Sequence, residues 1–114
     1  LHVYFKKVRI KPDAKGRAII LSEFGGYSHG VKGHVGSTTE FGYATYKTVE
    51  DFNNAFKKLY FTEIIPQIPT GLSATVYTQV SDVEDEVNGL LTYDRKVCKA
   101  DEKVFRDIMS NLKY

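Results

Sequence analysis

The sequence has little cysteine, no long apolar run and no block of like charge, and each of these features argues against one class of protein. The one cysteine, Cys98, cannot form an internal disulfide and fits a reducing compartment, so we expect a cytoplasmic location. No run of about eighteen apolar residues and no signal-peptide pattern is present, which argues against a membrane partner. The 16 Lys and Arg residues are scattered among 14 acidic residues, so the net charge is only +2 and no nucleic acid partner is expected.

The remaining composition is typical of a soluble globular protein, with 42% hydrophobic and 26% charged residues. A chain of 114 residues has room for one core, so we expect a single domain over residues 1–114. The chain opens on the apolar run Leu1–Phe5 without an initiator Met, and we interpret this as a cut inside a longer protein.

Short apolar and β-branched runs predict strands, and continuous apolar runs favour parallel strands covered by helices. A helix is predicted from Thr48, a cap with Asp51 three residues on, to Pro66, and a second begins at the cap Asp101. This order predicts an α/β fold with a parallel element. The expected strands are Leu1–Phe5, Arg17–Phe24, Leu72–Val80 and a shorter Leu90–Tyr93, and the helical stripes are Val49, Phe52, Phe56, Leu59 and Tyr60, then Val104, Ile108 and Leu112.

Two loops carry polar groups whose role the sequence leaves open. Residues 25–42 hold six of the nine glycines together with His29 and His34, which are either ligand contacts or solvated loop residues. Zinc needs three or four ligands, and two histidines with one distant cysteine do not supply them. The acids in residues 82–86 are either a solvated turn or an oxygen site for a divalent cation, without the spacing of an EF-hand. We therefore expect no metal and no cofactor.

Glu23 ends an apolar strand and is followed at once by Gly25 and Gly26. In parallel α/β folds the chemistry lies at the carboxyl ends of strands, and glycines there let a ligand approach the backbone closely. The other interpretation is that Glu23 is a strand-end acid paired with a nearby Lys or Arg.

Three segments in order resemble the family 2 glycoside hydrolases, the β-galactosidases, β-glucuronidases and β-mannosidases. Ile19–Gly25 is similar to the family's seventh barrel strand, Tyr77–Asp82 to its eighth, and Asn88–Arg95 to the segment that leads into its closing helix. The resemblance implies a partial (β/α)8 TIM barrel, about strands six to eight with two helices. It also implies that Glu23 is the catalytic nucleophile.

The same resemblance implies four residues that bind substrate or support the nucleophile. Tyr4 matches a tyrosine at the end of the family's sixth strand and is the expected hydrogen-bond donor to Glu23, with His2 in place of a polar partner. Tyr77 stands where the family usually has a Trp at the sugar site. Asn88 falls in a stretch that contacts substrate in some members.

The implied function is a fragment of a retaining β-glycosidase, which hydrolyses O-glycosidic bonds with two carboxyl groups about 5 Å apart. The family's acid/base lies in an Asn-Glu pair, and no Asn-Glu occurs here, so we expect the isolated chain to bind carbohydrate at most and to be inactive. A stand-alone carbohydrate- or ligand-binding α/β module and a structural domain are the alternatives. Open strand edges and an inner face with Leu21, Val76 and Tyr77 predict a homo-oligomer for the isolated chain.

Overall fold

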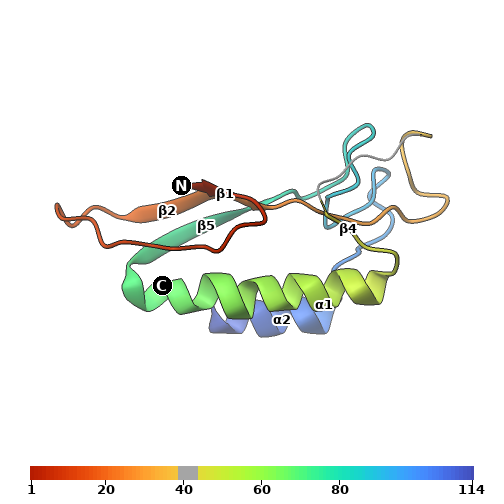
Figure 1. Cartoon of the computed structure of the whole chain (residues 1–114). Coiled ribbons are helices and arrows are strands. Elements are labelled where there is room, and N and C mark those ends of the chain that lie inside the picture. Colours follow the sequence, from red (N-terminus) through yellow and green to blue (C-terminus); the bar gives the residue numbers. More distant parts are fainter. Residues whose placement is uncertain (39–43) are drawn as a thin grey trace.

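The computed structural model describes residues 1–38 and 44–114, which form a small parallel sheet with helices along one side and loops at the carboxyl ends of the strands (Figure 1). The described chain is elongated, with extents of 49 × 25 × 20 Å. Its strands are β1 (His2–Val3), β2 (Ile19–Gly25), β3 (Tyr27–Ser28), β4 (Ala44–Thr45) and β5 (Leu72–Thr78), and its helices are α1 (Val49–Leu59) and α2 (Glu102–Asn111).

The main sheet has the order β1-β2-β5, and both pairs are parallel. The crossover from β2 to β5 contains α1, which lies beneath the sheet with α2 packed beside it (Figure 1). The strands β3 and β4 pair separately as a short parallel ribbon. The opposite face of the main sheet is left uncovered by helices in this view.

Both predicted helix starts are confirmed by the capping contacts. Thr48 Oγ1 accepts from the Asp51 N–H at 3.0 Å, and Asp101 Oδ1 accepts from the Val104 N–H at 3.0 Å. Pro66 does not end the first helical segment, because the chain continues from α1 through a π-helical turn (Tyr60–Ile64) into a 3-10 helix (Ile65–Thr70). Proline fits the first turn of that helix, where its missing N–H is not needed.

The core lies between the sheet and the helices. Phe56 of α1 meets Tyr60 and Tyr77 edge-on, with ring centroids 5.2 Å apart in both pairs, and Phe24 of β2 meets the same two tyrosines at 5.5 Å. Such edge-to-face pairs add to the burial of these large rings. The buried cluster consists of Val8, Ile10, Leu21, Phe24, Phe56, Tyr60, Ile64, Leu72, Ala100 and Ile108.

An irregularity in β2 decides which side chains face the helices. Leu21 is the register partner of Thr75 and Phe24 that of Tyr77, so two residues of β2 stand opposite the single Val76 of β5. This bulge lets both Leu21 and Phe24 be buried although they are three residues apart. The expectation that Leu21 and Tyr77 share the inner face with Val76 is therefore wrong, since Leu21 and Tyr77 pack toward the helices.

The expected partial (β/α)8 barrel, about strands six to eight, is also wrong. The strands form a small three-stranded sheet, β1 has two residues, and the segment 4–18 that joins β1 to β2 contains no helix. Extended chain lies in the place of that helix. It is held against the helical stretch by the N–H groups of Val8 and Ile10, which donate to Glu63 and Gln67 at 3.0 Å.

The predicted fourth strand is absent as well. Residues 90–93 make only isolated bridges, in which Leu91 pairs with Ser81 and Cys98. Apolar composition alone does not distinguish such a loop, held by single bridges, from a strand in a continuous ladder.

Candidate functional site

Glu23 is held by two side chains on the uncovered face of the sheet. The Tyr4 hydroxyl donates to Glu23 Oε1, and His2 Nδ1 lies 2.9 Å from Glu23 Oε2. The side chain of Glu23 is 38% exposed and that of His2 is 57% exposed, so the carboxylate is fixed in direction and still open to solvent. The hydrogen bond expected from Tyr4 is present.

The register of the strands brings the three side chains together. His2 and Glu23 are partners in the parallel β1–β2 ladder, so their side chains lie on the same face, and Tyr4 follows two residues later. The bulge in β2 turns Glu23 away from the helices and onto this face. The ring of Tyr4 lies edge-on to His2 at 5.1 Å and stacks on Phe5 at 6.1 Å, which restricts its orientation.

Tyr77, expected at the sugar site, lies on the other side of the sheet. Its ring packs edge-on against Phe24 and Phe56, and burial raises the pKa of its phenol well above the usual value. A Cβ built on Gly25 would come within 2.8 Å of Tyr77 Cδ2, so the bare backbone of Gly25 accommodates the ring. The structure therefore does not bring Tyr77 to the carboxylate of Glu23.

Asn88 is buried in the loop after β5 and makes contacts within that loop. Its Oδ1 accepts from Gln79 Nε2 at 2.6 Å, and its backbone oxygen accepts from the Gln79 N–H at 3.3 Å. The described contacts thus make Asn88 a brace of the loop and do not join it to the group around Glu23.

A buried ion pair that no sequence pattern predicts fixes the loops at the carboxyl ends of β2 and β5. Lys99 Nζ donates to Asp82 Oδ1 at 2.7 Å and to the carbonyl oxygens of His29 and Val87 at 2.9 Å. Asp82 Oδ1 also accepts from the Gly89 N–H at 2.8 Å. No local pattern marks Lys99, because its partners come from three separate segments.

The two loop histidines are each bonded within the protein. His29 Nδ1 lies 2.8 Å from the carbonyl oxygen of Tyr46, and His34 Nδ1 lies 2.7 Å from Asp94 Oδ2. Hydrogen bonds from the Thr92 hydroxyl and from His34 hold the pKa of the Asp94 carboxyl well below its usual range. Residues 39–42 of the glycine-rich loop lie outside the described residues.

Neither loop forms a metal centre within the described part of the chain. No group of three or more His, Cys, Asp or Glu side chains in residues 1–38 and 44–114 could hold a metal ion. In the acidic loop Glu84 and Asp85 are exposed, and Glu86 is bonded to Gln79 Nε2 at 3.2 Å. These acids are therefore arranged as a braced surface turn.

Comparisons with family models and curated proteins supply no relative, so the function has to be argued from the geometry of the site. No helix among the described residues has the length and apolar character needed to cross a membrane. No protein-family model matches the sequence, and no curated protein matches it either.

Proposed function

We propose that this chain carries the nucleophile of a retaining β-glycosidase and that Glu23 is that nucleophile. The observation that carries the proposal is that both carboxylate oxygens have a partner, Oε1 in Tyr4 and Oε2 in His2. The carboxylate lies on the uncovered face of the sheet, at the carboxyl end of a parallel strand. The resemblance of Ile19–Gly25 to the nucleophile strand of family 2 glycoside hydrolases supports the same role.

The geometry suits attack on a sugar carbon. In retaining hydrolysis an ionised carboxylate attacks the anomeric carbon and forms a glycosyl-enzyme, which water then hydrolyses. A hydrogen bond donated by Tyr4 fixes the plane of the Glu23 carboxylate. Because the side chain remains 38% exposed, a substrate approaching the uncovered face can reach it.

The general acid has to come from residues other than these. A retaining enzyme needs a second carboxyl group about 5 Å from the nucleophile to protonate the leaving oxygen. Among the described residues, the side chains bonded to Glu23 are Tyr4 and His2, and the sequence contains no Asn-Glu pair. We therefore propose that the chain alone binds a β-glycoside without turning it over, and that the active protein works in the cytoplasm, where the exposed thiol of Cys98 would stay reduced.

The test is Glu23→Gln in an active enzyme that contains this chain. The amide cannot attack, so we expect kcat to fall by about 10⁴-fold, as for removal of other nucleophiles, with the fold unchanged by circular dichroism. Added azide should restore turnover of an activated aryl β-glycoside. The matched control is Glu50→Gln, an exposed acid of α1, which should keep the parental kcat. A Glu23→Gln enzyme with near-parental kcat would refute the role.

A second variant tests the support given to the nucleophile. Tyr4→Phe removes one hydroxyl that donates to a charged group, a loss of about 1.5–3 kcal/mol, so we expect kcat to fall by about 10- to 100-fold with a smaller change in KM. If kcat is unchanged while Glu23→Gln is inactive, Tyr4 has no part in the reaction.

A binding module without catalysis is the second candidate. It is favoured by the absence of a second carboxyl group among the described partners of Glu23, since an open carboxylate can also accept hydrogen bonds from sugar hydroxyls. Saturating sugar binding without turnover in every assembly that contains the chain would favour this candidate.

A further inference from the structure

One short segment is strongly basic, although the charge of the whole chain is nearly balanced. Residues 6–17 contain six of the 16 Lys and Arg residues and one of the 14 acidic residues, which gives the segment +5 in a chain with a total of +2. The rest of the chain therefore carries −3 (+2 less +5). Such a concentration of one sign attracts an anionic partner. The six cations are Lys6, Lys7, Arg9, Lys11, Lys15 and Arg17.

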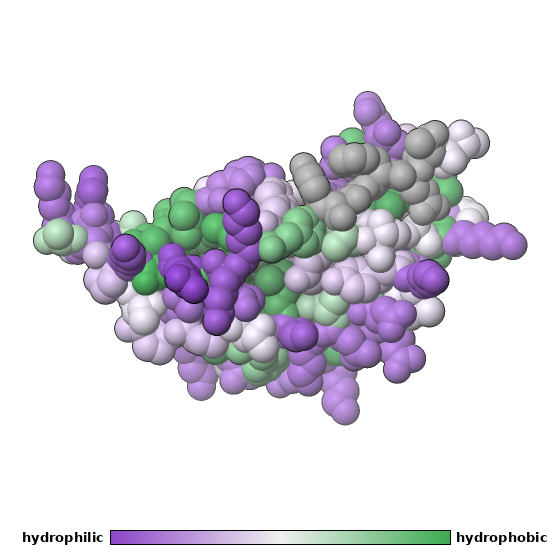
Figure 2. Space-filling model, viewed as in Figure 1, coloured by the Kyte–Doolittle hydropathy of each residue, from purple (hydrophilic) through white to green (hydrophobic). Residues whose placement is uncertain are grey.

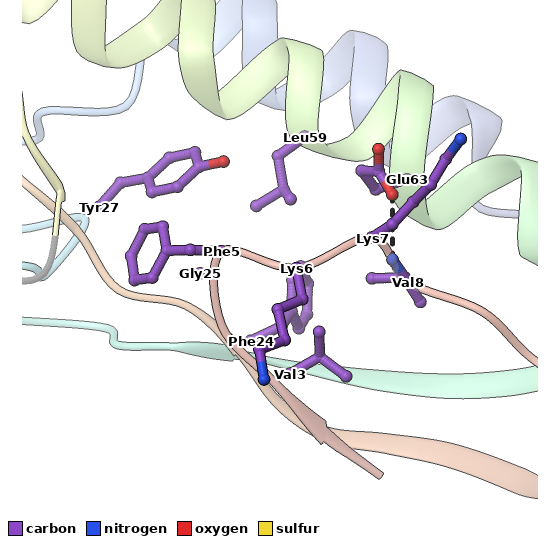
Figure 3. Close-up of a pocket in the computed structure, with 10 residues that line it drawn as sticks. All are labelled: Val3, Phe5, Lys6, Lys7, Val8, Phe24, Gly25, Tyr27, Leu59 and Glu63. Carbon is purple, nitrogen blue, oxygen red and sulfur yellow. Dashed lines mark hydrogen bonds between the residues drawn. The ribbon is translucent and has the colours of Figure 1, made fainter.

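The segment is held in place from one side. The N–H of Val8 donates to Glu63 Oε2 and that of Ile10 to Gln67 Oε1, both at 3.0 Å. Figure 3 shows the chain between Phe5 and Val8 running below Glu63, with the hydrogen bond of Val8 dashed. The side chains of Val8 and Ile10 belong to the buried core. Because the segment is ordered before a partner arrives, binding to it costs less conformational entropy.

Three of the cations lie on the face of this segment that points away from the core. Val8 and Ile10 are buried whereas Lys7, Arg9 and Lys11 are exposed, which is the alternation expected of an extended chain. Side chains on one face of an extended chain recur at every second residue, about 6.5–7 Å apart. We call Lys7, Arg9 and Lys11 the basic row.

The acids close to the segment are engaged elsewhere. Glu63 accepts from the Val8 N–H, and Asp13 forms an ion pair with Arg17 at 2.9 Å. Within residues 1–38 and 44–114, no ion pair joins a carboxylate to the basic row. Its charges therefore remain available to carboxylates of another molecule.

The backbone of the basic row also has an open edge. In an extended chain the N–H and C=O groups of alternate residues point to the same edge, and the edge of Val8 and Ile10 faces the helical stretch. In the described part of the chain, no hydrogen bond joins a backbone N–H or carbonyl oxygen of the basic row to another residue. Such an edge can pair with an added strand.

We propose that this edge binds an extended acidic peptide segment of a partner protein as an added strand, with a carboxylate at every second residue beside the basic row. Main-chain hydrogen bonds would supply affinity, and the alternate side chains would supply specificity. Carboxylates opposite cations across two paired strands stabilise the pairing. The proposal does not rest on the role of Glu23, since the segment contains none of the groups that hold it.

A peptide suits this edge better than a nucleic acid does. Phosphate oxygens can accept from the N–H groups and attract the cations, but they cannot donate to the carbonyl oxygens of the same edge. A peptide strand offers donors and acceptors in alternation and therefore pairs with both.

The experiment compares two labelled peptides by fluorescence polarisation. In one peptide Glu alternates with Thr, and in the other the same residues are arranged with all glutamates consecutive. We expect the alternating peptide to bind about fivefold more tightly, because all its carboxylates fall on one face of an extended chain, and we expect added salt to weaken its binding.

A pair of variants tests the basic row. Arg9→Gln combined with Lys11→Gln removes two of its charges, and we expect about fivefold weaker binding of the alternating peptide, since each exposed ion pair contributes little. Lys58→Gln combined with Lys103→Gln is the matched control, because it removes the same charge from exposed positions of α1 and α2. The control should bind as the parent does, and circular dichroism should show that both variants are folded.

Hydrogen exchange measured by NMR tests the pairing itself. The N–H groups of Lys7 and Arg9 should exchange more slowly when the alternating peptide is bound, because an added strand would accept from them. A peptide held by charge alone would leave their exchange unchanged, and that result would overturn the strand pairing.

Three further results would overturn the proposal. The first is no binding of the alternating peptide at low salt. The second is a folded Arg9→Gln and Lys11→Gln variant that binds this peptide as tightly as the parent does. The third is equal or tighter binding of the consecutive-glutamate peptide or of a short oligothymidylate, which would assign the segment to charge alone or to nucleic acid.

Discussion

Lys99 Nζ lies 2.7 Å from Asp82 Oδ1, and both side chains are almost completely removed from solvent. The other donors of the same ammonium group bind the carbonyl oxygens of His29 and Val87, which belong to the loops after β2 and β5. One buried cation therefore joins three loop segments next to the carboxyl ends of the strands. A charge in this position is stable only while its partners remain in place.

Lys99→Met should accordingly be strongly destabilising. It leaves the Asp82 carboxylate buried without its cation, and breaking a buried pair in this way costs about 3–5 kcal/mol. Urea unfolding of the variant would measure the loss. Lys103→Met, at an exposed position of α2, should change the free energy of unfolding by less than about 0.5 kcal/mol. Equal stability of the two variants would contradict the importance assigned to the pair.

Gly25→Ala should destabilise the protein more than Gly16→Ala. Both glycines have positive φ, +99° and +68°, so each substitution introduces backbone strain of about 1–2 kcal/mol. The new methyl group at Gly25 would also collide with the ring of Tyr77, whereas nothing lies within 4 Å of the one at Gly16. We expect an additional loss of about 1–3 kcal/mol from this overpacking, measured by denaturant unfolding. If the two variants unfold at the same urea concentration, the ring of Tyr77 has room to move.

Alkaline solution should unfold the protein through its buried tyrosines. Burial raises the pKa values of Tyr77 and Tyr60 above their usual value of 10.0, and that of Tyr27 to about 12. The folded state therefore holds these phenolic protons more tightly than the unfolded state. Their contribution is fully present below pH 10 and is lost as the pH rises above it, toward the folded-state pKa values.

Parallel measurements of tyrosinate absorbance and circular dichroism would show this. We expect the last tyrosinates to form together with the loss of helix. Tyr77→Phe should raise the pH of that transition, provided that the variant folds, and Tyr93→Phe at an exposed position should leave it in place. Complete ionisation of all tyrosines in a folded protein would contradict the prediction.

The uncovered face of the sheet should drive association with a second copy of the chain. Ile20 and Val76 lie on this face with 48% and 54% of their surface exposed, and Figure 2 shows hydrophobic surface over β1 and β2. Burial of such surface is favourable by about 25 cal/mol per Å², and β1 and β5 also offer unpaired strand edges. We expect light scattering at micromolar concentration to give a dimer or a larger assembly.

Val76→Lys should shift that equilibrium toward the monomer, because a charge in the contact would lose its hydration. Val49→Lys, at an exposed position of α1, is the matched control and should leave the assembly unchanged. A parent chain that remains monomeric at the highest soluble concentration would refute the prediction.

Local chemistry is what the sequence predicted well. The caps Thr48 and Asp101 depend on contacts within a few residues, and both are present. Of the predicted stripe of the first helix, Phe52, Phe56 and Tyr60 are buried, whereas Val49 is 41% exposed. The central parts of β2 and β5 are strands as predicted. The contact between Tyr4 and Glu23 was expected from the family resemblance, and the parallel pairing of β1 with β2 brings the two residues together.

The remaining features depend on contacts between distant segments. Lys99 has partners at His29, Asp82 and Val87, and no spacing rule connects these positions. The segment 4–18 has apolar residues but no helical period, and the burial of Val8 and Ile10 depends on their hydrogen bonds to Glu63 and Gln67, which are far away in the sequence. The barrel was expected from the resemblance of three short segments to a known family, and such a resemblance does not determine how many strands pair or how they are connected.

The bulge gives β2 one residue more than β5 between Leu21 and Phe24. Two residues of β2, Ser22 and Glu23, stand opposite one residue of β5, so deleting Ser22 would restore a regular ladder between Leu21 and Phe24. In that ladder Glu23 alone would stand opposite Val76, and its side chain would stay on the open face. The pairing of His2 with Glu23 would be kept, whereas the hydrogen bond from Ser22 to Leu1 would be lost. A one-residue deletion would thus test whether the bulge itself, and not only the side chains of His2, Tyr4 and Glu23, is needed for the proposed site.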